Sequence, residues 1–141
     1  MKLSMESACL CAQNELPPGV EMFSLPTAPA NKNDWLAWFP LNASICGSSC
    51  TVGLLTAIYL PEAEFSEVEW HSDPELFLIV SGEGTMLLPN DGGWKLVRLL
   101  EGTTLRIAKG IPHYFGPSLT PAVLCVVANC PDARTEYRSL L

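Results

Sequence analysis

Glycine- and proline-containing turns divide the chain after residue 50 into short apolar stretches. No longer segment shows a convincing helical period. The stretches expected to form strands are 52–60, 67–71, 75–80, 85–88, 94–99, 103–107 and 121–128. Short strands at nearly regular spacing, with turn residues between them, predict an all-β sandwich or barrel.

The length and composition of the chain are those of a single domain with a sizeable hydrophobic core. The chain has 141 residues, of which 48% are hydrophobic and 16% charged, whereas disordered chains show the opposite balance. We expect an N-terminal arm of one or two short strands over 1–50, as part of the same domain, a barrel over 51–130 and a C-terminal tail over 131–141. The aromatic residues of the arm that are candidates to cover a barrel mouth or a dimer contact are Trp35, Trp38 and Phe39.

Charge and hydropathy exclude two classes of partner. The formal net charge is −7, and the eight Lys and Arg residues are scattered, so no basic surface for nucleic acid is expected. The first dozen residues contain no apolar run and predict no secretory signal. The apolar stretches are too short to cross a bilayer. The sequence therefore predicts a soluble, cytoplasmic protein with neither nucleic acid nor membrane as partner.

Six cysteines stand at positions 9, 11, 46, 50, 125 and 130. Because no export signal is expected, ordinary free or buried thiols are favoured over a disulfide framework. A disulfide between Cys46 and Cys50 is the main alternative. The spacing of Cys9 and Cys11, and that of Cys46 and Cys50, also suits zinc or thiol chemistry.

The chain has only two histidines, and both lie where an expected strand meets a turn. In 69-EWHSDPE-75, Glu69 and His71 are two residues apart, so they share one face of a strand. Glu75 opens the next strand after a tight turn and can return to that face. His113 follows the turn 108-AKGIP-112. On a rolled sheet these four side chains can meet inside the barrel.

The first of these segments resembles the first motif of the cupin superfamily, G-x5-H-x-H-x3-4-E-x6-G. The chain reads Glu69-x-His71-x3-Glu75-x6-Gly82, which matches the second histidine, the glutamate and the final glycine in register. It departs from the motif at the opening glycine, which is Ala63, and at the first histidine, which is Glu69.

The second segment is similar to the second cupin motif, G-x5-P-x-G-x2-H-x3-N. The chain reads Gly102-x5-Ala108-x-Gly110-x2-His113, again in register. The proline of the motif is replaced by Ala108 and the closing asparagine by Pro117. Together the two motifs cover residues 69–113. The resemblance implies a cupin-type double-stranded β-helix, or jelly-roll barrel.

The resemblance also implies one divalent transition metal, with Fe, Mn and Zn as the leading candidates, held by His71, Glu75 and His113. Glu69 is either a fourth ligand, giving a set of two histidines and two carboxylates, or a catalytic base beside the metal. Without Glu69, the other three residues form the two-histidine, one-carboxylate set suited to non-haem iron. The replacement of the first histidine leaves a metal-free barrel as the alternative.

The implied function is that of a metal-dependent enzyme acting on a small oxygenated organic molecule. Dioxygenase-type chemistry is slightly favoured, with a lyase, isomerase or cyclase next. The alternative of another class is a non-catalytic cupin that binds a small molecule. Cupins of this length resemble one another in often being homodimers, so the resemblance also implies a homodimer.

Residues near the four-residue constellation are candidates for binding the substrate. They are chosen for strand parity with Glu75 or His113, or for nearness in sequence, and are Tyr59, Phe77, Ile79, Arg106 and Phe115. Ordinary barrel core is the alternative for the apolar members. Arg106 can hold an anionic substrate, or it can form a salt bridge at the rim.

Overall fold

A computed structural model describes residues 1–24 and 50–141. These residues form twelve strands and two short 3-10 helices, η1 (Met5–Ser7) and η2 (Gln13–Glu15). The strands are β1 (Lys2–Ser4), β2 (Val20–Ser24), β3 (Thr51–Ile58), β4 (Glu62–Glu64), β5 (Glu67–His71), β6 (Glu75–Ser81), β7 (Gly84–Asn90), β8 (Gly93–Leu99), β9 (Thr103–Ile107), β10 (Tyr114–Phe115), β11 (Ala122–Asn129) and β12 (Thr135–Ser139). The predicted all-β class is confirmed. The predictions made for Trp35, Trp38, Phe39 and Cys46 lie outside the described residues.

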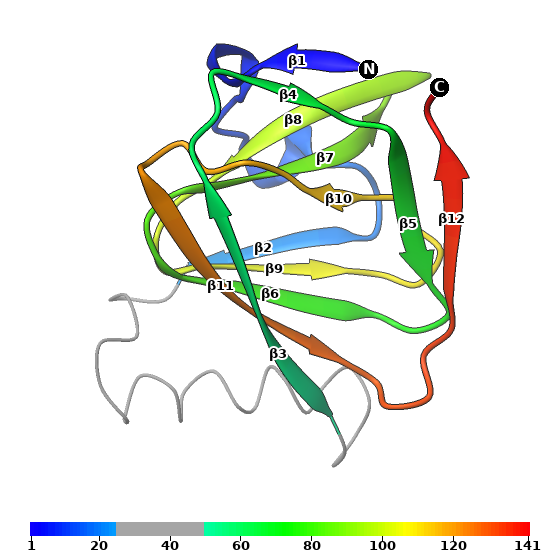
Figure 1. Cartoon of the computed structure of the whole chain (residues 1–141). Helices are drawn as coiled ribbons and strands as arrows, with labels where there is room; N and C mark the ends of the chain where they lie inside the picture. The colour runs from blue at the N-terminus through cyan, green and yellow to red at the C-terminus, as the bar shows by residue number, and fades with distance from the viewer. Residues whose placement is uncertain (25–49) are drawn as a thin grey trace.

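The strands form a barrel-like arrangement of antiparallel sheets. A five-stranded sheet has the order β2-β9-β6-β11-β3, and a three-stranded sheet has the order β10-β7-β8. β1 pairs with β4, and β5 pairs with β12, as two further two-stranded sheets. Figure 1 shows the three-stranded sheet above the five-stranded one, with β5 and β12 side by side along one flank. The barrel interior therefore lies between the two sheets.

Alternating side chains fill this interior, as period two requires of strands in a closed sheet. On β6, Phe77 and Ile79 belong to the central cluster, and on β9, Leu105 and Ile107 do. Each is at most 3% exposed, and full burial of such a side chain contributes about 1.5–3 kcal/mol. This core fixes β6, the strand that begins with Glu75.

Gly82 shows why the motif needs glycine at the end of β6. Its φ of +76° lies in the left-handed region, which side chains with a Cβ adopt only at a cost. A Cβ built at this position would also overlap the backbone oxygen of Ala122, at the start of β11. Glycine therefore allows the chain to turn against β11.

Both ends of the chain take part in the sheets. Residues of the expected arm form β2, which pairs with β9, and β1, which pairs with β4. Residues of the expected tail form β12, which pairs with β5. The sequence did not indicate β12, because its side chains are exposed and polar or aromatic rather than apolar. Among the described residues, no helix is long and apolar enough to span a membrane.

Candidate metal centre

Backbone hydrogen bonds hold the four constellation residues together. Glu69 and His113 form an isolated antiparallel bridge: Glu69 N donates to His113 O at 3.0 Å, and His113 N donates to Glu69 O at 2.9 Å. Gly110 N donates to His71 O at 2.9 Å. The turn before His113 is thus fixed against β5. Glu75 begins β6 immediately after the turn that ends β5.

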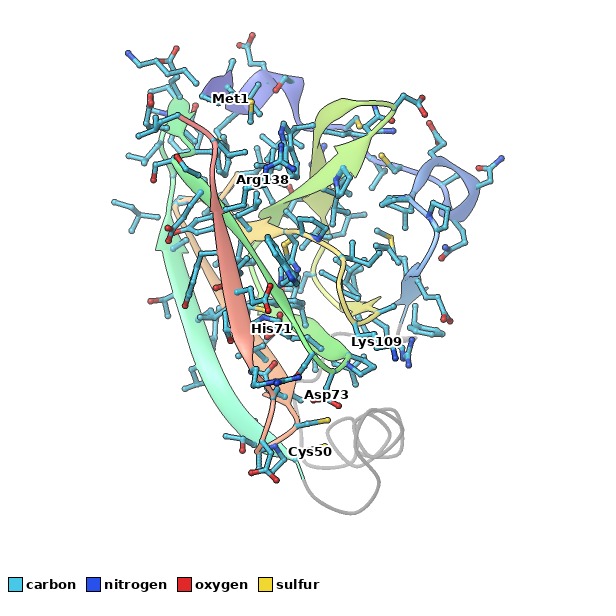
Figure 2. The ribbon with its side chains drawn as sticks, turned by 90° about the vertical axis from the view of Figure 1, so that its right-hand side faces the viewer. Met1, Cys50, His71, Asp73, Lys109 and Arg138 are labelled. Atoms are coloured by element: carbon cyan, nitrogen blue, oxygen red, sulfur yellow. The ribbon has the colours of Figure 1, made fainter. Side chains whose placement is uncertain are left out.

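The side chains of these residues converge on one point. His113 Nε2 lies 2.8 Å from Glu75 Oε1, and His71 Nε2 lies 3.3 Å from Glu75 Oε2. Glu69 Oε1 lies 3.8 Å from His71 Nε2. One potential ligand atom from each of Glu69, His71 and His113 lies within 4.8 Å of the others. In Figure 2, His71 lies on β5, where this strand runs beside β12.

Burial differs across the centre. The side chains of His113 and Glu75 are 1% and 5% exposed, that of His71 is 10% exposed and that of Glu69 is 30% exposed. His71, Glu75 and His113 therefore form an inner group shielded from water. Glu69 stands at the side of this group that meets solvent, which suits either of its two expected roles.

The second ring nitrogen of each histidine has a partner that fixes the ring. His113 Nδ1 lies 2.9 Å from Ile111 O, and His71 Nδ1 lies 2.9 Å from the hydroxyl of Thr135 on β12. A carbonyl oxygen only accepts, so Nδ1 of His113 carries a proton and donates it. Partners of this kind orient the histidines that ligate metals.

The donor set fits a divalent transition metal. With Nδ1 protonated, a neutral His113 ring turns the lone pair of Nε2 toward Glu75, so their close contact requires a second proton or a shared cation. His71 Nε2 is buried, and its 3.3 Å contact with Glu75 Oε2 lacks the geometry of a well-directed hydrogen bond among the described residues. Imidazole nitrogens and carboxylate oxygens are ligands of Fe, Mn and Zn.

Electrostatic interactions within the centre shift the pKa values of Glu75 and His71. Burial raises the pKa of Glu75, but hydrogen bonds and charge interactions with His113 and His71 outweigh it and hold this pKa below its ordinary value. The contact with Glu75 raises the pKa of His71, against the opposing effect of burial, and the charge of Glu69 adds to the rise. Metal-free, the centre therefore favours a carboxylate at Glu75 and a proton on His71.

A cavity of about 750 Å³ opens beside the centre, within the size range of small-molecule sites. Glu69, His71 and Glu75 line it. Phe77 and Phe115 also line it, with ring centroids 6.4 Å apart and ring planes 4° apart. The cavity is thus lined both by polar side chains of the types that bind metals and by aromatic rings.

The other predicted substrate-binding residues do not line this cavity. Tyr59 is 48% exposed, and its backbone bridges to Ser118. Ile79 is buried in the central core. Arg106 has the parity opposite to the inward-facing residues of β9, and its Nη1 lies 3.7 Å from Oε1 of Glu21 on β2. Arg106 therefore forms a cross-strand ion pair away from the site.

Sequence reasoning missed cavity residues on β3, β11 and β12. These lining residues include Leu55 and Ala57 on β3, Asn129 on β11 and Tyr137 on β12. The alternation of β3 could have indicated Leu55 and Ala57, because both share one strand face. No comparable signal marked Tyr137, since the register that places it opposite Glu69 depends on the pairing of β12 with β5.

Comparisons with known proteins bear on the fold. No protein-family model matches the chain, and no curated protein matches it in sequence. A structure of acireductone dioxygenase from Bacillus anthracis, with a cadmium ion in its active centre, superposes with a TM-score of 0.54. It is 16% identical, over 81% of this chain and 79% of that chain. The chain has the cupin fold.

Two other similar structures are of larger proteins. A mutant of Bacillus subtilis oxalate decarboxylase gives a TM-score of 0.46 at 16% identity, over 86% of this chain and 27% of that chain. Procruciferin, an 11S globulin from Brassica napus, gives 0.43 at 14% identity, over 62% of this chain and 22% of that chain. The chain thus spans about a quarter of the length of each of these two proteins.

The cupin fold confirms the jelly-roll prediction drawn from the two motifs. Their residues meet at one end of the cupin barrel, where the turn between β5 and β6 and the turn before His113 lie together. Glu69, at the position of the motif's first histidine, lies beside the other three residues. The replacement thus leaves an oxygen donor in the place of a nitrogen donor.

Proposed function

We propose that this cupin is a metal-dependent enzyme acting on a small oxygenated organic molecule, with dioxygenase-type chemistry. The observation that carries the proposal is the convergence of His71 Nε2 and His113 Nε2 on the carboxylate of Glu75, beside a cavity of about 750 Å³. The likeness in fold to a dioxygenase structure that holds a metal ion in its active centre adds support.

In this proposal His71, Glu75 and His113 hold one divalent metal, with Fe, Mn or Zn as candidates. A bound divalent cation supplies Lewis-acid polarisation of a substrate oxygen and stabilises developing negative charge. Phe77 and Phe115 exclude water from one side of the substrate, which strengthens electrostatic interactions at the centre. Glu69 serves either as the fourth ligand or as a base.

The position of Glu69 favours a second candidate, a lyase, isomerase or cyclase. Its carboxylate lines the cavity, is 30% exposed and lies 3.8 Å from His71 Nε2. A carboxylate that reaches both the centre and the cavity can accept a proton from a bound substrate. Proton transfer of this kind begins elimination and isomerisation without oxygen.

Oxygen dependence separates the two candidates. The protein is loaded with Fe(II), Mn(II) or Zn(II) and screened against small enediols, hydroxy ketones and keto acids, with and without oxygen. Oxygen uptake that disappears in both His71→Ala and His113→Ala supports the dioxygenase. Turnover without oxygen that disappears in Glu69→Gln supports the second candidate. Full turnover in folded His71→Ala and His113→Ala contradicts both.

We also propose that the protein is a homodimer that pairs through β3. This strand is an outer strand of the five-stranded sheet, and residues 50–61 contain no charged side chain. Val52, Leu54 and Ile58 are 50%, 68% and 66% exposed. Proteins usually protect an edge strand with charges, so an uncharged apolar edge favours pairing with a second copy.

Light scattering tests the dimer. Wild-type protein is expected to have twice the chain mass, and Leu54→Lys is expected to shift it to a monomer. Glu62→Lys, on β4, is the matched surface control and should stay dimeric. A monomeric wild type at high micromolar concentration contradicts the proposal. We further propose that the protein acts in the cytoplasm, where a thiol such as that of the buried Cys125 persists in reduced form.

A further inference from the structure

Cys9 and Cys11 form a thiol pair on the segment between η1 and η2. Their Sγ atoms are 3.2 Å apart. The backbone of Cys9 is fixed to β8, because Cys9 N donates to Leu96 O at 3.0 Å and Arg98 N donates to Cys9 O at 2.8 Å. Two residues separated by one position in extended chain share a side, so this anchoring holds the two thiols face to face.

The two thiols differ in access to solvent. Cys9 is half-buried, whereas Cys11 is 6% exposed and packs into the central core cluster with Leu16 and Val20. A reagent in solution therefore meets Cys9 first. Cys11 is placed to attack whatever bond Cys9 forms, because its sulfur already lies against that of Cys9.

A cation stands beside the pair. Lys95 on β8 interacts with the Cys11 thiol, and its Nζ also donates to Glu15 O at 3.3 Å. Burial and the neighbouring Cys9 raise the pKa of Cys11, and Lys95 opposes this rise. An ammonium group next to a thiol pair stabilises the thiolate that forms during exchange.

Lys95 also lines a groove on this side of the molecule. The groove has a volume of about 750 Å³ and is separate from the cavity beside the metal centre. Trp94 and Arg138 line it together with Lys95 and Glu15. Lys95 thus belongs both to this groove and to the surroundings of the Cys11 thiol.

We propose that Cys9 and Cys11 are a redox-active dithiol that low-molecular-weight disulfides oxidise to an intrachain disulfide. The Cys9 thiolate attacks one sulfur of the small disulfide, whose S–S bond breaks and releases one thiolate. The Cys11 thiolate then attacks Cys9 Sγ in the mixed disulfide and releases the second thiolate. The two cysteines lose two protons and two electrons, and the small disulfide gains them as two thiols.

The geometry of Cys9 and Cys11 favours both the formation of the disulfide and its later reduction. The sulfur atoms must approach from 3.2 Å to the bond length of about 2.05 Å, which side-chain rotation can supply. The ring spans only three residues, so closing it adds little of the loop-entropy stabilisation that longer loops provide. Such a disulfide is expected to be labile, as regulatory disulfides are.

Oxidised glutathione is the probe. The intact protein is incubated with it, remaining thiols are blocked with an alkylating reagent, and the tryptic peptide 3–32, which contains only Cys9 and Cys11 among the cysteines, is analysed by mass spectrometry. We expect a peptide lighter by two hydrogen atoms, with no glutathione attached, and its return to the dithiol with excess reduced glutathione. A wild-type peptide that remains unmodified, or that carries glutathione without closing, overturns the proposal.

Variants test the order of attack. Cys11→Ser should trap the mixed disulfide on Cys9, and Cys9→Ser should react at least tenfold more slowly than Cys11→Ser. Cys125→Ser is the matched control, since Cys125 is fully buried on β11, and should close as the wild type does. Equal reaction of the two single variants contradicts the assigned roles. The wild-type mass measurement is decisive even where a variant fails to fold.

Discussion

At the scale of residues, the two histidines of the centre are held by unlike partners. His113 Nδ1 donates to a backbone carbonyl that no substitution removes, whereas His71 Nδ1 depends on the hydroxyl of Thr135. The orientation of His71 is therefore the more vulnerable of the two. Thr135 also comes from β12, so the end of the chain takes part in the centre.

Thr135→Val tests this support. The substitution keeps the shape of the side chain and removes the hydroxyl, so it should lower metal affinity about 10- to 100-fold, as loss of a second partner does at other metal-bound histidines. Thr135→Ser keeps the hydroxyl and should stay near the wild type. Competition with a chromophoric chelator measures both. Equal affinities for the Val and Ser variants would show that the hydroxyl does not orient His71.

The pH dependence should reverse between metal-free and metal-loaded protein. The pKa of His71 is raised above 6.5 in the folded chain, so its contribution to stability is full below that value and is lost as pH rises through the folded pKa. Metal requires the neutral ring, so loading should instead strengthen as pH rises. Urea unfolding from about pH 6 to pH 9, with and without chelator, measures both trends. His71→Gln should show neither of these two pH trends. If this variant keeps the pH dependence of the wild type, the trends do not arise from His71.

At the scale of elements, the sequence is sufficient to predict which residues meet when their strands follow one another along the chain. Glu69, His71 and Glu75 lie on β5 and β6, which are joined by a short turn, so strand parity and the turn together predict their meeting. The motif spacing then indicated His113, and its backbone bridge with Glu69 brings it to the same place.

Prediction was less successful where pairing partners are distant in sequence. β12 is polar and exposed, and it exists as a strand because β5 offers it an edge. Tyr59 and Arg106 were chosen for nearness in sequence, which does not say which way a side chain points. Arg106 follows the outward parity of β9 instead and pairs with Glu21.

A comparison of Gly82 with Gly92 distinguishes the cost of backbone strain from the cost of steric overlap. Gly82 and Gly92 have φ of +76° and +83°. A Cβ at Gly92 meets no atom within 4 Å, whereas a Cβ at Gly82 overlaps Ala122 O. Gly92→Ala should therefore cost about 1–2 kcal/mol of conformational strain, and Gly82→Ala about 1–3 kcal/mol more. Urea unfolding measures the difference, and equal costs would mean that the turn relaxes around the added methyl group.

At the scale of the whole molecule, the barrel brings together residues that are far apart along the chain. Segments near both ends close its flanks, β2 against β9 and β12 against β5. The candidate metal centre lies next to the cavity, whereas neither Cys9 nor Cys11 lines that cavity. Chemistry at the centre and oxidation of the thiol pair can therefore be measured independently.

The metal content of the purified, untagged protein tests the central claim most directly. Wild-type protein, as isolated or after incubation with Fe(II), Mn(II) or Zn(II) and desalting, should hold about one equivalent of one metal by elemental analysis. His71→Ala and His113→Ala, shown by circular dichroism to be folded, should hold less than about a tenth of that, while the matched control Phe115→Leu should load as the wild type does. A folded wild type without metal after all three incubations, or equal metal in the folded histidine variants, would contradict a metal centre at His71, Glu75 and His113.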